Sequence, residues 1–149
     1  MGHFVTATAI GASWVTALRD ALDAGSGPAT ANAYSGTQPT SGGALSGNTL
    51  LGTWTLSDPS GSISGRSVTI TAPAAVTAVA DGTCSFVRFA NSAGAFVMDI
   101  PAMSASEWAA LTDDQKAAQG LVITLNSAVI YTGGGLSFSA NLVISDPNG

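Results

Sequence analysis

The stretch Cys84–Ile100, CSFVRFANSAGAFVMDI, decides the fold that we expect for this chain. Two apolar runs rich in Phe and Val flank the polar segment Asn91–Gly94, where Gly94 can supply the positive φ of a short loop and Asn91 suits the first turn position. The second arm alternates with the period of a strand that has one better-buried face. The pattern predicts a β-hairpin, and because it holds three of the five phenylalanines, we expect it at the centre of the core.

The composition describes a single domain with few charges. A chain of 149 residues can bury a core without disulfides or metals, so we expect one domain over residues 1–149. Only 9% of the residues are charged, against about 25% in ordinary soluble domains. The surface must therefore be mostly Ser, Thr, Asn, Gly and Ala. Such a surface has little to keep copies apart, which suits a protein packed against neighbours, although some secreted lectin-like sandwiches share it.

Charge and cysteine content argue against several classes of protein. The net charge is −5, and the four basic residues do not cluster, so we expect no nucleic-acid partner. A single cysteine excludes an internal disulfide. The first residues carry no Lys or Arg before an apolar run and make a poor signal peptide. No run of about 18 apolar residues occurs, so we expect no membrane span.

One long helix is predicted near the N-terminus, over residues 10–24, after a mobile terminus of residues 1–9. An apolar stripe recurs there at helical period, and Gly25 is placed to end the helix. The stripe consists of Ile10, Trp14, Ala17, Leu18, Ala21 and Leu22. We favour packing of this stripe on the chain's own sheet, and docking onto a partner subunit is the alternative.

The remainder, residues 29–147, predicts a series of short strands separated by turn residues. We expect these strands at Ala29–Tyr34, Leu50–Leu56, Ser67–Ala72, Ala75–Ala80, Leu121–Leu125, Ala128–Tyr131 and Leu136–Ser145, besides the two arms of the hairpin. The last has the cleanest alternation, and Asp81-Gly82 predicts a tight turn leading into the central hairpin. The expected fold is mainly β, an antiparallel β-sandwich or jelly roll with one N-terminal amphipathic helix.

A short helical insertion near residues 104–119 interrupts the strand pattern. Ser104 and Thr112 are each followed three residues later by Glu or Gln, which is the spacing of a capping box. We therefore predict two short helical turns over this segment, with Trp108 and Leu111 facing inward.

No combination of catalytic or ligand-binding side chains in the sequence specifies a chemistry. The only histidine, His3, lies in the predicted mobile terminus, and Cys84 lacks a plausible histidine to pair with. Asp113 and Asp114 are adjacent but fit the start of a helical turn. Trp14, Trp54 and Trp108 are expected in the core, and Arg88 should either reach solvent or pair with a carboxylate such as Asp99. We expect no enzyme, no cofactor and no metal site.

Several segments of the chain form a recognisable series of motifs: LRDALDAGSGPA at Leu18–Ala29, AYSGTQP at Ala33–Pro39, the pair Leu50-Leu51, and the pattern F-x-R-F-x-x-S-x-G-x-x-V-M-D at Phe86–Asp99. Together they resemble a family of small virion-associated structural proteins of tailed bacteriophages and prophages. The similarity extends to about Ile100 and resumes in Leu136–Pro147, whereas Pro101–Gly120 departs from it like an insertion. The family has no catalytic residues to transfer.

The resemblance implies a non-enzymatic virion protein, assembled in the cytoplasm of a bacterial host. We expect a multi-copy capsid decoration or head-auxiliary protein that forms a homo-oligomer and contacts other virion proteins, such as the major capsid protein. A tail, collar or connector component is the first alternative, and a carbohydrate-binding β-sandwich is the second.

Two segments are the expected attachment sites, because loops on a rigid scaffold usually carry recognition. They are Ser35–Asn48, predicted to be flexible, and Pro101–Gly120, predicted to be preformed by its caps; neither is expected to be needed to close the sandwich. The candidate interface residues are Gln38, Pro39, Trp108 and Leu111. For Trp108 itself, core and interface both remain open.

Overall fold

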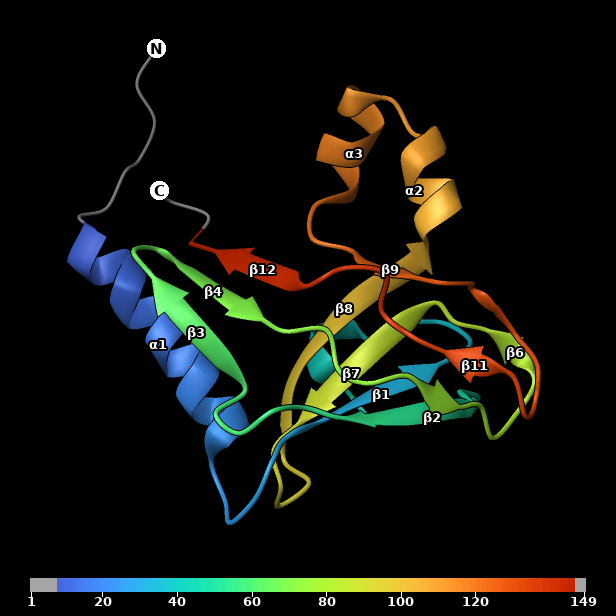
Figure 1. Cartoon of the computed structure of the whole chain (residues 1–149), viewed down its shortest axis with the longest axis horizontal. Helices are drawn as coiled ribbons and strands as arrows, with labels where there is room; N and C mark the ends of the chain where they lie inside the picture. Colours follow the sequence, from blue (N-terminus) through green and yellow to red (C-terminus); the bar gives the residue numbers. More distant parts are fainter. Residues whose placement is uncertain (1–7, 147–149) are drawn as a thin grey trace.

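A computed structural model describes residues 8–146 of the chain (Figure 1). Most of the predicted mobile terminus, residues 1–9, lies outside this range, while residues 8 and 9 begin the first helix. The helices are α1 (Thr8–Asp23), η1 (Thr40–Gly42), α2 (Ala105–Ala110) and α3 (Asp113–Gln119). The strands are β1 (Thr30–Tyr34), β2 (Leu50–Thr55), β3 (Gly61–Ser64), β4 (Ser67–Ile70), β5 (Val76–Thr77), β6 (Gly82–Thr83), β7 (Phe86–Ala90), β8 (Phe96–Ser104), β9 (Ile123–Leu125), β10 (Val129–Ile130), β11 (Gly135–Leu136) and β12 (Leu142–Ser145). The prediction of a mainly β fold with an N-terminal helix is confirmed.

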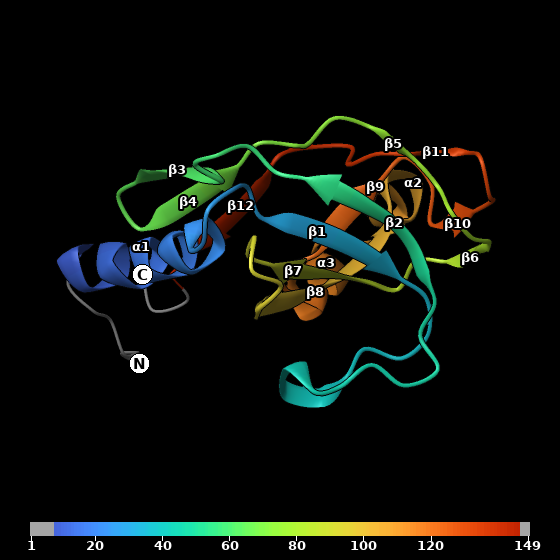
Figure 2. The same cartoon turned by 90° about the horizontal axis from the view of Figure 1, so that it is seen from below.

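The largest sheet has five strands in the order β2-β1-β7-β8-β9 and curls like half a barrel (Figure 2). Its first four strands are antiparallel, but β8 and β9 are parallel, so the expectation of purely antiparallel pairing is wrong for this sheet. Parallel neighbours require a crossover connection, and α2 and α3 supply it. The helical insertion is therefore part of the sheet's connectivity, contrary to the expectation that the fold could close without it.

The predicted hairpin is confirmed as β7 and β8, and its turn has the expected chemistry. Gly94 has φ +84°, and the Asn91 side-chain oxygen accepts hydrogen bonds from the amides of Ala93 and Ala95. The strand β8 continues beyond the predicted arm to Ser104 because β9 pairs with its last residues.

The hairpin lies at the centre of the largest sheet and contributes to the core, as predicted, but its three phenylalanines do not lie together. Phe89 lies in the main core, where Trp54 and Phe138 meet edge to face. Phe86 is buried on the opposite side of the sheet and stacks on Tyr34, and Phe96 is 44% exposed. The reason is register, since Phe86 and Phe89 are an odd number of residues apart and must point to opposite faces.

Helix α1 lies against the three-stranded sheet β12-β4-β3 (Figure 2). Its packing is confirmed to be on the chain's own sheet, through a buried line that contains Gly11, Val15 and Leu22. A side chain at Gly11 would collide with the buried ion pair between Arg66 and Asp146. The predicted stripe is only partly correct, because Leu18 and Leu22 turn inward whereas Ile10, Trp14, Ala17 and Ala21 are exposed.

The long alternating strand predicted at Leu136–Ser145 is divided among three partners. Leu136 pairs with Val76, Phe138 bridges to Leu125, and β12 pairs with β4. The alternation of buried residues survives although the chain passes from one sheet to another, which is why the period alone predicted one strand.

Two further predictions of local structure differ from what the chain adopts. Asp81-Gly82 forms no tight hairpin, because Gly82 and Thr83 pair with β10 and the Asp81 carboxylate accepts hydrogen bonds from the amide and hydroxyl of Thr132. Gly61–Ser64, which carried no strand prediction, forms β3 and pairs with β4.

Both capping boxes of the helical insertion are confirmed. The Ser104 hydroxyl accepts a hydrogen bond from the amide of Glu107 and the Thr112 hydroxyl accepts one from Gln115, and each acid or amide side chain reaches back to the capping residue. Neither helix contains a buried residue. Trp108 and Leu111, which were predicted to face inward, are therefore only half-buried and do not enter the core.

Candidate interaction surface

The segment between β1 and β2, residues 35–49, folds over the outer face of the five-stranded sheet, and we call it the β1–β2 loop. Figure 2 shows it projecting from the sheet on the side of β7 and β8, with the single turn η1 at its end. None of its residues is buried. Strand register explains which side chains lie beneath it, because alternate residues of β1, β7 and β8 face outward.

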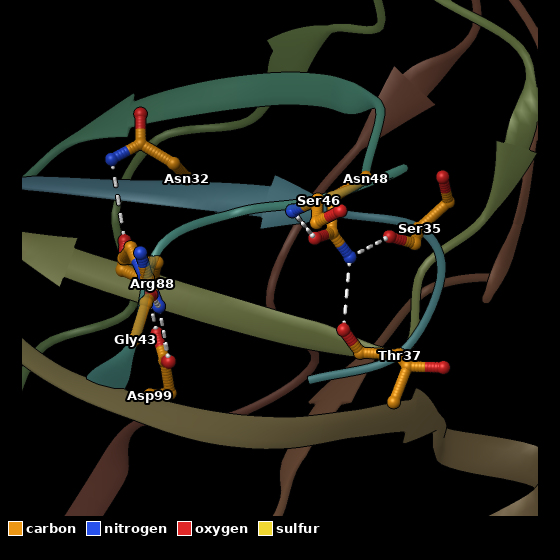
Figure 3. Close-up of polar contacts among 8 residues, drawn as sticks. All are labelled: Asn32, Ser35, Thr37, Gly43, Ser46, Asn48, Arg88 and Asp99. Carbon is orange, nitrogen blue, oxygen red and sulfur yellow. Dashed lines mark hydrogen bonds and ion pairs between the residues drawn. The ribbon is translucent and has the colours of Figure 1, made fainter. Parts of the chain in front are cut away.

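Arg88 fastens this loop to the sheet. Its Nε and Nη2 atoms donate hydrogen bonds to the two carboxylate oxygens of Asp99, each at 2.8 Å, and Nη2 also donates to the Gly43 carbonyl at 3.0 Å (Figure 3). The side chains of Arg88 and Asp99 are only 14% and 4% exposed. Hydrogen bonding to Asp99 raises the pKa of Arg88 despite partial burial. Of the two alternatives that the sequence leaves open for Arg88, solvent or a carboxylate such as Asp99, the structure shows the second. The contact with Gly43, which lies far away in the chain, was not predicted.

The aromatic ring of Phe96 adds an apolar contact beside the same ion pair. The Arg88 guanidinium lies 4.9 Å from the ring centroid, which is the geometry of a cation–π contact. On the loop side, Gly42 has φ +69°, and a Cβ atom there would stand 2.4 Å from the Phe96 ring. Only a glycine allows the loop to approach the ring so closely.

Asn48 fastens the base of the loop. Its amide nitrogen donates hydrogen bonds to the carbonyls of Ser35 and Thr37 at 2.8 and 3.0 Å, and its oxygen accepts one from the amide of Ser46 at 3.0 Å (Figure 3). Ser35 and Thr49 are joined by a backbone hydrogen bond. Because side chains hold both its base and its tip, the β1–β2 loop has a defined conformation in the structure, with contacts that the expectation of a flexible loop did not include.

A row of polar side chains crosses the sheet beside the loop. Thr53 donates a hydrogen bond to the side chain of Asn32, which donates to the backbone carbonyl of Arg88. Asn32, Arg88 and Asp99 occupy paired positions on three adjacent strands. These hydrogen bonds give the polar side chains of the row partners on the sheet. At its exposed end, the hydroxyl of Thr53 can both donate and accept hydrogen bonds.

The four predicted interface residues fall on two separate segments. Gln38 is exposed and Pro39 is half-buried at the start of η1, both on the β1–β2 loop. Trp108 and Leu111 belong to residues 105–119, which we call the α2–α3 segment, where the Lys116 ammonium lies 5.7 Å from the Trp108 ring centroid. Within residues 8–146, no hydrogen bond or ion pair joins the two segments, so the chain presents two candidate surfaces.

The tryptophan, cysteine and aspartate side chains that were considered as catalytic or ligand-binding residues lie in the core, on the surface or in a helix turn. Trp54 is fully buried and its indole N–H donates to the Leu136 carbonyl, as expected of a core residue, whereas Trp14 is 46% exposed, contrary to expectation. Burial raises the pKa of the Cys84 thiol to about 11. Asp113 and Asp114 lie in the first turn of α3, as predicted. His3 lies outside the described residues.

Three further features of the described residues concern metals, membranes and cavities. Residues 8–146 contain no group of three or more His, Cys, Asp or Glu side chains that could hold a metal ion. No helix in this range is both long and apolar enough to cross a membrane. A hollow of about 20 Å³ beside Ile123, Phe138 and Leu142 has room for about one water molecule.

Comparisons with known proteins give no further assignment. No protein family, no curated protein and no solved structure matches the chain.

Proposed function

We propose that the chain is a non-enzymatic structural protein of a tailed-bacteriophage particle, present in many copies as a capsid decoration or head-auxiliary protein. The proposal rests on the sequence resemblance, and one structural observation supports it. The segments that carry the resemblance are joined by direct contacts, because Ala33 and Tyr34 pair with Val87 and Phe86 of the hairpin pattern. The Tyr34 ring also stacks on the ring of Phe86. Motifs that contact one another and form one scaffold are what we expect of a structural protein.

A second contact within the same motifs extends this support. The hydroxyl of Ser92, in the hairpin turn, accepts a hydrogen bond from the amide of Gly27 and donates one to the carbonyl of Ala24. The hairpin therefore fixes the end of the helix–linker motif as well as the β1–β2 loop. We also propose that the fold is a jelly-roll-like sandwich, in which the curled sheet and the smaller sheets enclose one core.

The surfaces proposed to contact other virion proteins are the β1–β2 loop and the α2–α3 segment. Both lack buried residues, so their side chains are not committed to the core. Both are also held in place before any partner binds, the loop by Arg88 and Asn48 and the helices by their caps. A preformed surface loses less conformational entropy on binding than a flexible one. The difference is roughly 1–2 kcal/mol for each residue whose backbone would have to become ordered.

Mass spectrometry of purified phage particles tests the main proposal. We expect the chain to be present at hundreds of copies per particle, as decoration of a capsid requires. Six or twelve copies would favour the connector, collar or tail alternative, and absence from the particles would contradict a virion role.

A substitution at Trp108 tests the attachment surface. Because Trp108 is half-buried on a helix without buried residues, Trp108→Ala should leave the domain's stability nearly unchanged and weaken attachment to particles by about 2 kcal/mol or more. The exposed Tyr131, which lies on neither proposed surface, is the matched control, and Tyr131→Ala should leave attachment unchanged. A loss of several kcal/mol in the free energy of unfolding of Trp108→Ala would place Trp108 in the core instead.

A further inference from the structure

Helix α1 is apolar on two adjacent faces, and its own sheet covers only one of them. The covered face contains Val15 and Leu22, which are 0% and 1% exposed. The second face, which we call the outer stripe, carries no charge and consists of Ile10, Trp14, Ala17 and Ala21. Ile10 and Trp14 are 59% and 46% exposed. A helix that is apolar beyond its packed face is ordinarily covered by another element.

The order of side chains along the outer stripe is complementary to itself. Its first half presents the two large residues and its second half presents the two alanines. When two copies of α1 lie antiparallel with a two-fold axis between Trp14 and Ala17, Trp14 of each copy faces Ala17 of the other, and Ile10 faces Ala21. Both large residues thus meet small ones in a single register, as an isologous interface requires.

The charges of α1 favour the same orientation. Its last turn contains no base, and its exposed acid is Asp20, which is 62% exposed and also pairs with Arg19, while its first turn contains no acid. Asp23 faces away from the outer stripe and accepts a hydrogen bond from the amide of Ser60. Carboxylates are unfavourable at the negative, C-terminal end of a helix and favourable near a positive, N-terminal end. An antiparallel neighbour places its N-terminal turn near Asp20, whereas a parallel neighbour would bring the two copies of Asp20 together.

We propose that α1 is a self-association surface, through which a second copy of this chain pairs antiparallel along Ile10, Trp14, Ala17 and Ala21. This inference does not depend on the virion role. Four residues cover less than the roughly 800 Å² per partner found in stable dimers, so the free chains pair weakly. Copies already held side by side would pair much more effectively, because the second contact is then intramolecular.

Disulfide trapping tests the pairing and its direction, since it captures weak contacts. Two single variants, Ile10→Cys and Ala21→Cys, are made in a Cys84→Ser background. Each variant then has one cysteine, so every cross-link must join two chains. In the antiparallel pair, residue 10 of one copy lies about 16 Å along the helix from residue 10 of the other, beyond the roughly 7 Å limit of a disulfide, and the same holds for residue 21. We expect a mixture of the two variants to give at least tenfold more covalent dimer than either variant alone.

Two charge substitutions make the test specific. Adding Trp14→Lys to both cysteine variants should lower the cross-link in the mixture at least tenfold. Adding Val143→Lys, which charges a residue of β12 that is 51% exposed, should leave it unchanged. Urea denaturation of each variant checks that these exposed positions leave the fold intact. Equal cross-linking by the single variants, no cross-linking in the mixture, or equal loss with Val143→Lys would overturn the proposal.

Discussion

The β1–β2 loop and the α2–α3 segment are two projections without buried residues that keep their shapes by different means. The helices are held locally, because each capping box satisfies its donors within four residues of chain. The tip of the loop is held from a distance, by Arg88 and Phe96 of the hairpin, which lie more than forty residues farther along the chain. The comparison teaches that exposure alone does not predict flexibility. What matters is whether a segment's polar groups have partners and where in the chain those partners lie.

Among the changes considered, removing the guanidinium of Arg88 should lower the stability of the domain most. Arg88→Ala leaves the Asp99 carboxylate, which is 4% exposed, without its partner, and should lower the free energy of unfolding by about 3 kcal/mol. Urea denaturation measures the loss. Limited proteolysis should cut the β1–β2 loop faster while α2–α3 is unchanged, and equal loosening of both projections would refute the distinction between them.

Arg19→Ala is the matched control for Arg88→Ala. Arg19 forms an ion pair with Asp20 whose side chains are 30% and 62% exposed. Exposed pairs contribute little, so this variant should change stability by less than about 1 kcal/mol and leave the loop intact.

Blocking the close approach of the loop to Phe96 should have a smaller effect. Gly42→Ala adds a Cβ atom 2.4 Å from the ring and strains a backbone at φ +69°, and it should cost about 2 kcal/mol. Gly47→Ala separates the two causes, because Gly47 has φ +71° but open space around its Cβ position. It should cost about 1 kcal/mol from backbone strain alone. Equal losses in urea denaturation would show that the ring contact contributes nothing.

Removing a helix cap should act only on the other projection. Ser104→Ala deletes the hydroxyl that accepts a hydrogen bond from the Glu107 amide, and should cost about 1 kcal/mol. Hydrogen exchange should accelerate at Glu107 and not at the amides of the β1–β2 loop. Ser104→Thr keeps a capping hydroxyl and serves as the control; acceleration in the loop would show that the two projections are coupled.

Changing the pH between 6 and 9 should have the smallest effect on the loop. The pKa of Arg88 is raised by Asp99, so the stability it contributes is fully present below its unfolded pKa and constant across this range. Hydrogen exchange in the loop, corrected for intrinsic rates, should therefore not change. Altered protection between pH 6 and 9 would mean that another titrating group holds the loop.

Above pH 9 the whole domain should lose stability through Cys84. Burial raises the pKa of its thiol to about 11, so the unfolded chain deprotonates first and is favoured as the pH rises from about 9 to 11. Cys84→Ser should remove this part of the loss in urea denaturation at pH 10.

The sequence by itself determined the features whose partners lie a few residues away. Both capping boxes, the Asn91–Gly94 turn and the helical period of α1 follow from local hydrogen bonding and side-chain spacing, and all were predicted correctly. The pairing of Arg88 with Asp99 was also within reach, because a hairpin places facing residues at a known register.

The tertiary structure alone decided the choices among distant partners. The period of α1 could not tell which half of its stripe would face the sheet, since a helix repeats the same spacing on adjacent faces. The alternation of Leu136–Ser145 could not reveal that its residues pair with β5, β9 and β4 in turn. The conformation of the β1–β2 loop depends on Arg88 and Phe96, which lie beside it only after the sheet has formed. Local rules fix which groups need partners, and the arrangement of the whole chain decides which partners they find.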